Sequence, residues 1–181
     1  MEGSAKSVLL HICCAPCSIY PLKRLRMDGA DVSGYFYNPN VHPYAEFLKR
    51  LHTLEGYAGD SLLPLAVDKS YGLETFLKGA LEYGKDRCLF CYRIRLEKTF
   101  QKGAGEGFDA VTTTLLYSRY QRHDDIKAIG EELSGSYSIE FLYEDFRKGW
   151  KEGVEESKHL DMYRQQYCGC IFSERDRFER G

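Results

Sequence analysis

The sequence predicts an α/β fold in which one parallel sheet is covered by helices on both faces. Five short stretches rich in apolar, β-branched or aromatic residues alternate with longer stretches of helical periodicity. Such alternation is typical of parallel sheets, whose strands are joined by helices. With 181 residues, 43% of them hydrophobic and 29% charged, the chain has the size and composition of one globular domain. We therefore treat residues 1–181 as a single domain.

The expected strands are short runs bounded by turn residues. They cover residues 8–10, 32–37, 62–67, 109–116 and 138–143. The expected helices carry apolar residues three or four positions apart. They cover residues 19–27, 44–57, 73–81, about 87–102 and 124–133. We expect the last of these helices to be capped by an aspartate and to end at Ser134-Gly135.

Two further segments do not follow this alternation. The glycines of residues 103–107 lack the spacing of a phosphate-binding loop, so this stretch is predicted to be a plain linker. From about residue 144 the chain is polar and favours helix, and this tail finishes at Cys168-Gly169-Cys170.

Composition limits the environment and the partners. No apolar run approaches the roughly 20 residues of a membrane span, and the amino terminus has no signal-peptide pattern, so we expect a cytoplasmic protein without a membrane partner. A net charge of −2 does not indicate a general nucleic-acid binder, so any such contact must be local. Seven cysteines in a reducing compartment suggest metal binding or redox catalysis.

The cysteines fall into three groups. They are Cys13, Cys14 and Cys17, then Cys88 and Cys91, then Cys168 and Cys170. The first group follows the first predicted strand, at the carboxyl edge where open α/β sheets bind ligands. The second lies near the start of a predicted helix, where three-residue spacing places both thiols on one face and the helix dipole favours their thiolates.

Four thiolates from two separated pairs can hold either tetrahedral zinc or an iron–sulfur cluster, and the spacing does not decide between them. The adjacency of Cys13 and Cys14 favours the larger cluster. Cys168-Gly169-Cys170 can close a small redox-active disulfide ring or form a second metal half-site. Cys17 is left over, either to support the site, to ligate a further metal or to pack in the core.

Other polar residues are candidates for substrate contact or proton transfer. His11 lies in a predicted strand and is expected to be a core residue, whereas His42 and His123 lie in predicted loops at the carboxyl edge of the sheet, where either could donate a proton. Tyrosines and arginines lie close together around Cys91 and Tyr120, a combination suited to unstacked bases and phosphates.

Six segments make the sequence resemble a known family. They are HICCAPCS, YFYNPNVHP, RCLFCYRIRL, TTTLLYSRYQRHDDI, YEDFRKGW and MYRQQYCGCIFSE, in order over nearly the whole chain. The chain resembles the QueH family of epoxyqueuosine reductases, which implies a HUP-like (adenine nucleotide alpha hydrolase-like) five-stranded parallel sheet with a helical C-terminal tail. ATP-using relatives of this fold carry a Ser-Gly-Gly-x-Asp-Ser loop after the first strand. Here the cysteine turn replaces it, so ATP is not expected.

The resemblance implies an oxidoreductase that converts epoxyqueuosine, at the wobble position of a tRNA anticodon, to queuosine. It implies a [4Fe-4S] cluster held by Cys13, Cys14, Cys88 and Cys91, a redox-active pair formed by Cys168 and Cys170, and a second, mononuclear iron held by leftover cysteines and a carboxylate. An unidentified electron donor is required. We also expect catalytic roles for Cys17 and His123. The residues expected to contact substrate are Asn38, Asn40, His42, Tyr92, Arg93, Tyr120 and Gln121.

Two other functions remain open from the residues alone. One is a zinc-dependent RNA-binding module without catalysis, and the other is a thiol–disulfide oxidoreductase that uses Cys168 and Cys170. The metal content and the response to single cysteine substitutions distinguish these functions from the reductase.

Overall fold

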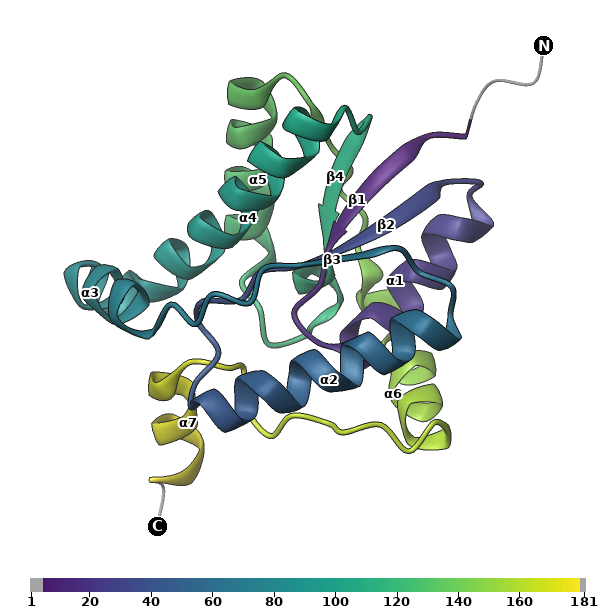
Figure 1. Ribbon diagram of the computed structural model, residues 1–181. Coiled ribbons are helices and arrows are strands. Elements are labelled where there is room, and N and C mark those ends of the chain that lie inside the picture. Colours follow the sequence, from purple (N-terminus) through teal and green to yellow (C-terminus); the bar gives the residue numbers. More distant parts are fainter. Residues whose placement is uncertain (1–4, 180–181) are drawn as a thin grey trace.

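The computed structural model describes residues 5–179 and contains one five-stranded, fully parallel sheet. The strand order is β3-β2-β1-β4-β5, with β1 at the centre (Figure 1). The strands are β1 Ser7–His11, β2 Asp31–Phe36, β3 Leu65–Val67, β4 Ala110–Thr113 and β5 Glu140–Phe141. This confirms the predicted parallel α/β sheet. Chain order reverses on either side of β1, so β1 ends at the switch point where such sheets bind ligands.

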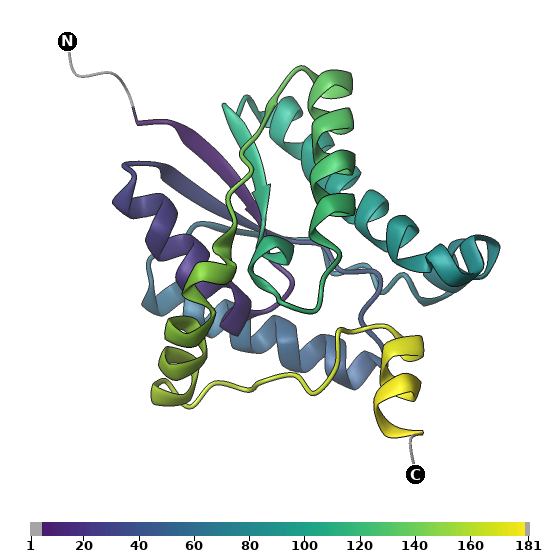
Figure 2. The same ribbon diagram turned by 180° about the vertical axis from the view of Figure 1, so that it is seen from behind.

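Helices cover both faces of the sheet, as predicted. The α-helices are α1 Ala15–Met27, α2 Tyr44–Asp60, α3 Leu73–Tyr83, α4 Arg87–Glu106, α5 His123–Tyr137, α6 Trp150–His159 and α7 Ile171–Phe178. The 3₁₀ turns are η1 Gly84–Asp86, η2 Thr114–Tyr117 and η3 Phe146–Gly149. Figures 1 and 2 show α4 and α5 on one face, and α1, α2 and α6 on the other. No helix within residues 5–179 is both long and apolar enough to cross a membrane.

The register of the central strands determines where the cysteine turn leaves the sheet. His11, the last residue of β1, is paired with Tyr35 of β2 and Thr113 of β4. Its fully buried ring contacts the Thr113 hydroxyl at 2.9 Å and the Tyr37 carbonyl at 3.1 Å. His11 is therefore a hydrogen-bonded core residue, as predicted, and the chain after it emerges beside the end of β4.

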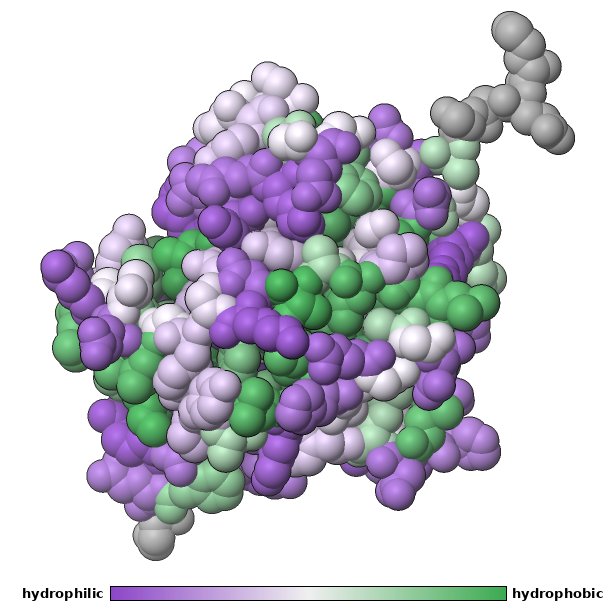
Figure 3. Space-filling model, viewed as in Figure 1, coloured by the Kyte–Doolittle hydropathy of each residue, from purple (hydrophilic) through white to green (hydrophobic). Residues whose placement is uncertain are grey.

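The tail is helical, as predicted, and its last part crosses the molecule in extended form. Residues 160–170, here called the strap, run from α6 beside α2 to α7 (Figures 1 and 2). The strap brings Cys168 and Cys170 to the end of the sheet that carries the other cysteines. Figure 3 shows hydrophobic and hydrophilic residues interspersed over one face of the molecule.

Several expected boundaries were wrong: the strands expected at residues 62–67 and 138–143 are shorter, and the helix expected from residue 19 begins at Ala15. Three other differences have a structural reason or involve a helix end. The linker predicted at residues 103–107 is the last turn of α4, because Gly103 packs so closely that an added Cβ would lie 2.7 Å from Val111. The threonine-rich strand predicted to reach residue 116 ends at Thr113, whose hydroxyl accepts a hydrogen bond from the Leu115 amide and starts η2. Helix α5 has no side-chain cap and continues through Ser134-Gly135 to Tyr137.

Candidate metal centre and active site

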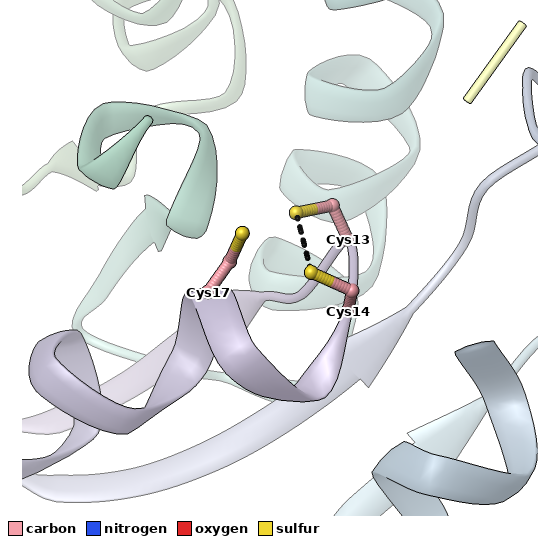
Figure 4. Close-up of side chains that lie close together, drawn as sticks. All are labelled: Cys13, Cys14 and Cys17. Atoms are coloured by element: carbon pink, nitrogen blue, oxygen red, sulfur yellow. Dashed lines mark hydrogen bonds between the residues drawn. The ribbon is translucent and has the colours of Figure 1, made fainter. Parts of the chain in front are cut away.

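Three thiols converge where β1 passes into α1. Cys13 and Cys14 form the turn, and Cys17 lies in the first turn of α1, three residues after Cys14 and so on the same side of the helix. Their sulfur atoms lie within 4.8 Å of one another, and those of Cys13 and Cys14 are 3.8 Å apart (Figure 4). This group, here called the thiol triad, is the only set of three or more potential metal ligands so close together in residues 5–179.

Side chains from two distant segments hold the thiol triad. The Thr114 hydroxyl of η2 donates to the sulfur of Cys13 at 3.3 Å and accepts from the Cys13 amide at 3.1 Å. From the strap, the amide of Gln165 donates to the sulfurs of Cys14 at 2.9 Å and Cys17 at 3.5 Å. The triad is therefore enclosed by β1, α1, η2 and the strap.

The three thiols of the triad differ in pKa. Hydrogen bonds from Cys14, Cys17 and Thr114 hold the pKa of Cys13 well below its ordinary value. Burial raises the pKa of Cys14, and hydrogen bonds with Cys13 and Cys14, together with burial, raise that of Cys17. The arrangement therefore places negative charge first on Cys13.

A second thiol group gathers at the start of α4. Cys88 and Cys91 lie in its first two turns, and negative charge on Cys168 or Cys170 acts on both of them. Burial raises the pKa of both thiols, that of Cys91 to about 12. Burial therefore disfavours the thiolates that the start of a helix would otherwise favour. All seven cysteines are free thiols in the structure.

A buried arginine connects the two thiol groups. Arg95, only 1% exposed, donates from Nη2 to the sulfur of Cys91 at 3.1 Å and from Nε to the Cys91 carbonyl at 3.1 Å. The groups whose ionised forms would act on it are Cys91, Cys168, Cys13 and Tyr92, and no carboxylate forms an ion pair with it in residues 5–179. From the sequence, Arg95 was one of the arginines near Cys91 expected to contact substrate; its bond to Cys91 was not predicted, although an arginine four residues after a helical cysteine shares its face.

A second buried arginine anchors the strap. Arg50 of α2 is 1% exposed and forms an ion pair with Glu46 at 2.7 Å. Its two terminal nitrogens donate to the carbonyls of Cys168 at 2.8 Å and Tyr167 at 3.0 Å. The strap is thereby fixed to α2 next to its two cysteines.

Gly169 allows the strap to lie this close. Its φ of 148° is one that other residues rarely adopt, and an added Cβ would lie 3.2 Å from the Arg50 guanidinium. The Gly169 carbonyl also accepts from the His42 amide at 2.8 Å.

Predicted substrate residues after β2 are buried and incompletely paired. Asn38, Asn40 and His42 are each at most 1% exposed. The Asn38 amide donates to the Ile12 carbonyl, and His42 Nε2 contacts the Pro39 carbonyl. Oδ1 of Asn38, Oδ1 of Asn40 and Nδ1 of His42 have no partner in the described part of the chain, which is unusual for buried polar atoms.

The other predicted residues have different surroundings. The Tyr92 hydroxyl donates to Gln121, whose amide donates in turn to the sulfur of Cys168 at 3.2 Å. Tyr120 is 85% exposed beside them. Arg93 instead forms a surface ion pair with Glu132 of α5 at 2.6 Å.

His123, predicted to lie in a loop, begins helix α5. It is buried, and this burial lowers its pKa, as does the charge of the nearby Arg147.

Comparison with known proteins identifies the family. A model of the family described as epoxyqueuosine reductase QueH matches residues 8–176. The chain belongs to the QueH family. Among its relatives, the epoxyqueuosine reductase QueH of Dehalococcoides mccartyi is 36% identical over 96% of both chains. That of Thermotoga maritima is 35% identical over 96% of this chain and 93% of its own.

A solved structure supports the fold of this QueH family member. The predicted subunit of a tRNA methyltransferase from Methanocaldococcus jannaschii superposes with a TM-score of 0.60 over 84% of this chain and 74% of its own. At 12% identity this likeness concerns the fold alone. It agrees with the parallel α/β sheet expected from the sequence.

The thiols of this QueH family member fit a metal centre. A tetrahedral ion with metal–sulfur bonds of about 2.3 Å holds its sulfurs about 3.8 Å apart. The sulfurs of Cys13 and Cys14 have this separation, 3.8 Å, and Cys17 lies within 4.8 Å of both. A [4Fe-4S] cluster takes four thiolates, so the triad needs at least one ligand from elsewhere. Cys88 and Cys91 are not part of this tight group, but Arg95 lies in the electrostatic range of both Cys91 and Cys13.

Proposed function

We propose that this chain reduces epoxyqueuosine in tRNA to queuosine, the last step of queuosine biosynthesis, at the wobble position of the anticodon. As a QueH family member it is an epoxyqueuosine reductase and an oxidoreductase. Removal of the epoxide oxygen as water takes two electrons and two protons. The observation that carries the proposal is the thiol triad, enclosed at the carboxyl end of the central strand, with the buried Arg95 in electrostatic range of Cys13 and of Cys91 and Cys168 from the other two groups.

We propose that Cys13, Cys14, Cys88 and Cys91 hold a [4Fe-4S] cluster and that Cys17 supports it or ligates a second iron. Such a cluster, when bound, supplies electrons one at a time at low potential. The chain's own residues prepare the site. Thr114 and Gln165 fix the triad sulfurs by hydrogen bonds, and the buried Arg95 offsets negative charge on Cys91 and Cys13.

Cys168 and Cys170 suit a role as a two-electron donor pair. Oxidation of two thiols to a disulfide releases two electrons and two protons, the same number that epoxide removal consumes. Gly169 gives the intervening backbone the freedom that such a small ring requires. An external reductant must then reopen the disulfide, and the cytoplasm supplies such reductants.

The modified base must leave its stack to reach the thiols. The unpaired oxygens of Asn38 and Asn40 and Nδ1 of His42 are candidates to hydrogen-bond it, because buried polar atoms without partners are costly unless a ligand pairs them. Tyr92 and Gln121 form a hydrogen-bonded link to Cys168, so both are also candidates to contact the modified base. His123 is the candidate proton donor, since burial and the charge of Arg147 lower its pKa and so favour release of a proton from the imidazolium.

The test is anaerobic purification followed by iron and sulfide analysis, and then incubation with tRNA that contains epoxyqueuosine and a strong reductant. We expect at least four irons per chain. Nucleoside mass analysis should show loss of one oxygen.

We expect Cys88→Ser to abolish turnover and lower the iron content, whereas Cys168→Ser should abolish turnover with iron retained. A colourless protein with one zinc and no turnover would overturn the proposal and favour the zinc-dependent RNA-binding module.

A further inference from the structure

A group of aromatic rings, one of them exposed, lies at the junction of η2, α5 and α6. The Tyr117 ring stacks on Trp150 with centroids 5.2 Å apart, and the Tyr120 ring meets Trp150 edge-on at 5.9 Å. The Arg119 guanidinium lies over Trp150 at 5.5 Å. Tyr117 is buried and Trp150 is half-buried, whereas Tyr120 is 85% exposed. We call Tyr117, Arg119, Tyr120 and Trp150 the aromatic platform.

The aromatic platform borders the cysteine site. Tyr120 is followed by Gln121, whose amide donates to the sulfur of Cys168 at 3.2 Å. At the inner end, Tyr117 is close enough to Cys17 and Cys14 for their charge to act on its hydroxyl. The aromatic platform and the cysteines are therefore neighbours in the fold.

Two exposed arginines next to the platform lack ion-pair partners. Arg119 and Arg164 both act electrostatically on Tyr117, and neither has an ion pair with a carboxylate in residues 5–179. Their neighbours Arg122 and Arg147 are paired with Asp125 and Asp145. Arg164 precedes Gln165, which contacts the thiol triad. Positive charge is thus available beside Tyr117 from both the segment after η2 and the strap, in a chain whose net charge is −2.

We propose that the aromatic platform binds the single-stranded part of the RNA substrate: Tyr120 stacks on a nucleobase next to the modified one, and Arg119 and Arg164 bind the flanking phosphates. Aromatic faces beside arginines are the usual means of holding unstacked bases. A role in stability explains the buried Tyr117 and its contact with Trp150. It does not explain Tyr120, since a side chain that is 85% exposed buries little apolar surface. This inference rests on the proposed function, which supplies RNA as the substrate.

The test measures RNA binding apart from catalysis. The probe is a fluorescently labelled anticodon stem-loop with unmodified guanosine at the wobble position, titrated anaerobically with the purified holoprotein and followed by anisotropy. We expect Tyr120→Ala to weaken binding about tenfold and Tyr120→Phe to bind as the wild type does, because stacking needs the ring and not the hydroxyl. The matched control is Tyr143→Ala, since Tyr143 is also exposed and lies under a cation, Lys127, at 5.0 Å.

Two further readouts separate stacking from charge. Arg119→Gln should reduce the slope of log K against log salt concentration by about one, whereas Tyr120→Ala should leave this slope unchanged. Binding of the stem-loop should also change the fluorescence emission of Trp150, the single tryptophan of the chain.

Equal affinity of wild type and Tyr120→Ala for the stem-loop would overturn the platform. Absence of turnover by a wild type that binds the stem-loop through Tyr120 would overturn the proposed function and leave the platform standing.

Discussion

Nη2 of Arg95 lies 3.1 Å from the sulfur of Cys91, and both side chains are buried. A buried guanidinium cannot lose its proton and is stable only next to compensating charge. The groups that can supply this charge on ionisation are chiefly the thiols of Cys91, Cys168 and Cys13. The fold therefore contains a fixed positive charge where thiolates are expected to bind iron.

Arg95→Gln should lower the reduction potential of the iron-loaded protein by about 60 mV or more, because loss of a nearby positive charge favours the oxidised, less negative centre. Spectroelectrochemical titration measures this shift. Arg95→Lys, which keeps the positive charge, should have a reduction potential close to that of the wild type. Arg93→Gln is the matched control, two residues away on the same helix but at the surface with Glu132. Equal potentials for Arg95→Gln and Arg93→Gln would contradict the charge-compensating role.

Arg50→Ala should release the strap. It removes the two hydrogen bonds to the carbonyls of Cys168 and Tyr167 and leaves Glu46 buried without its cation. Breaking a buried ion pair costs about 3–5 kcal/mol, so urea unfolding should show a loss of that order. Alkylation of Cys168 should also become faster, as mass spectrometry of peptides can show. A variant with wild-type stability and alkylation rate would rule out this anchor.

Metal loading should stabilise the fold through the thiol triad. Because a centre that binds only the native state raises the free energy of unfolding, the loaded protein should melt several degrees above the metal-free protein. Cys13→Ser should lose most of this difference, since Cys13 lies within 4.8 Å of both other triad sulfurs. Calorimetry of loaded and metal-free samples measures it. A full melting-temperature difference in Cys13→Ser would show that the metal binds elsewhere.

Gly149→Ala and Gly105→Ala should change stability in opposite directions. At Gly149 an added Cβ would lie 2.1 Å from the Tyr20 ring, so we expect a loss of about 1–3 kcal/mol. At Gly105, inside α4, nothing lies within 4 Å of the new Cβ. Alanine there should stabilise by about 0.5–1 kcal/mol through its helix propensity. Chemical unfolding of both variants provides the comparison, and the same sign for both would refute the packing argument.

The ionised carboxylate of Asp145 should stabilise the fold at neutral pH and lose this effect in acid. Hydrogen bonds from Arg147 lower the pKa of Asp145 from 3.8 to about 2. Because the folded-state pKa is the lower one, the stabilisation is fully present above the unfolded value near pH 4 and is lost as the pH falls towards 2. The difference in urea midpoint between wild type and Asp145→Asn should therefore shrink between pH 5 and pH 2. A difference independent of pH would contradict this assignment.

The sequence alone predicted much of the site because neighbouring residues define it. Cys13, Cys14 and Cys17 lie within five positions, so the end of a strand and one helical turn bring their sulfurs together. The spacing of Cys88 and Cys91 likewise placed them on one face of α4. The sequence pattern gave a wrong prediction at residues 103–107, where the glycines suggested a break in the helix. Glycine is needed inside the helix here because Gly103 packs closely on Val111.

Local periodicity thus determined the parallel α/β sheet, the thiol turn after the first strand and the helical tail. The tertiary structure decided what surrounds the thiols: Thr114 on Cys13, Gln165 on Cys14, and the buried Arg50 and Arg95. These contacts join residues up to 151 positions apart. The strand pattern is a property of short segments, whereas burial and charge compensation depend on the whole packed chain, so no short stretch of sequence specifies them.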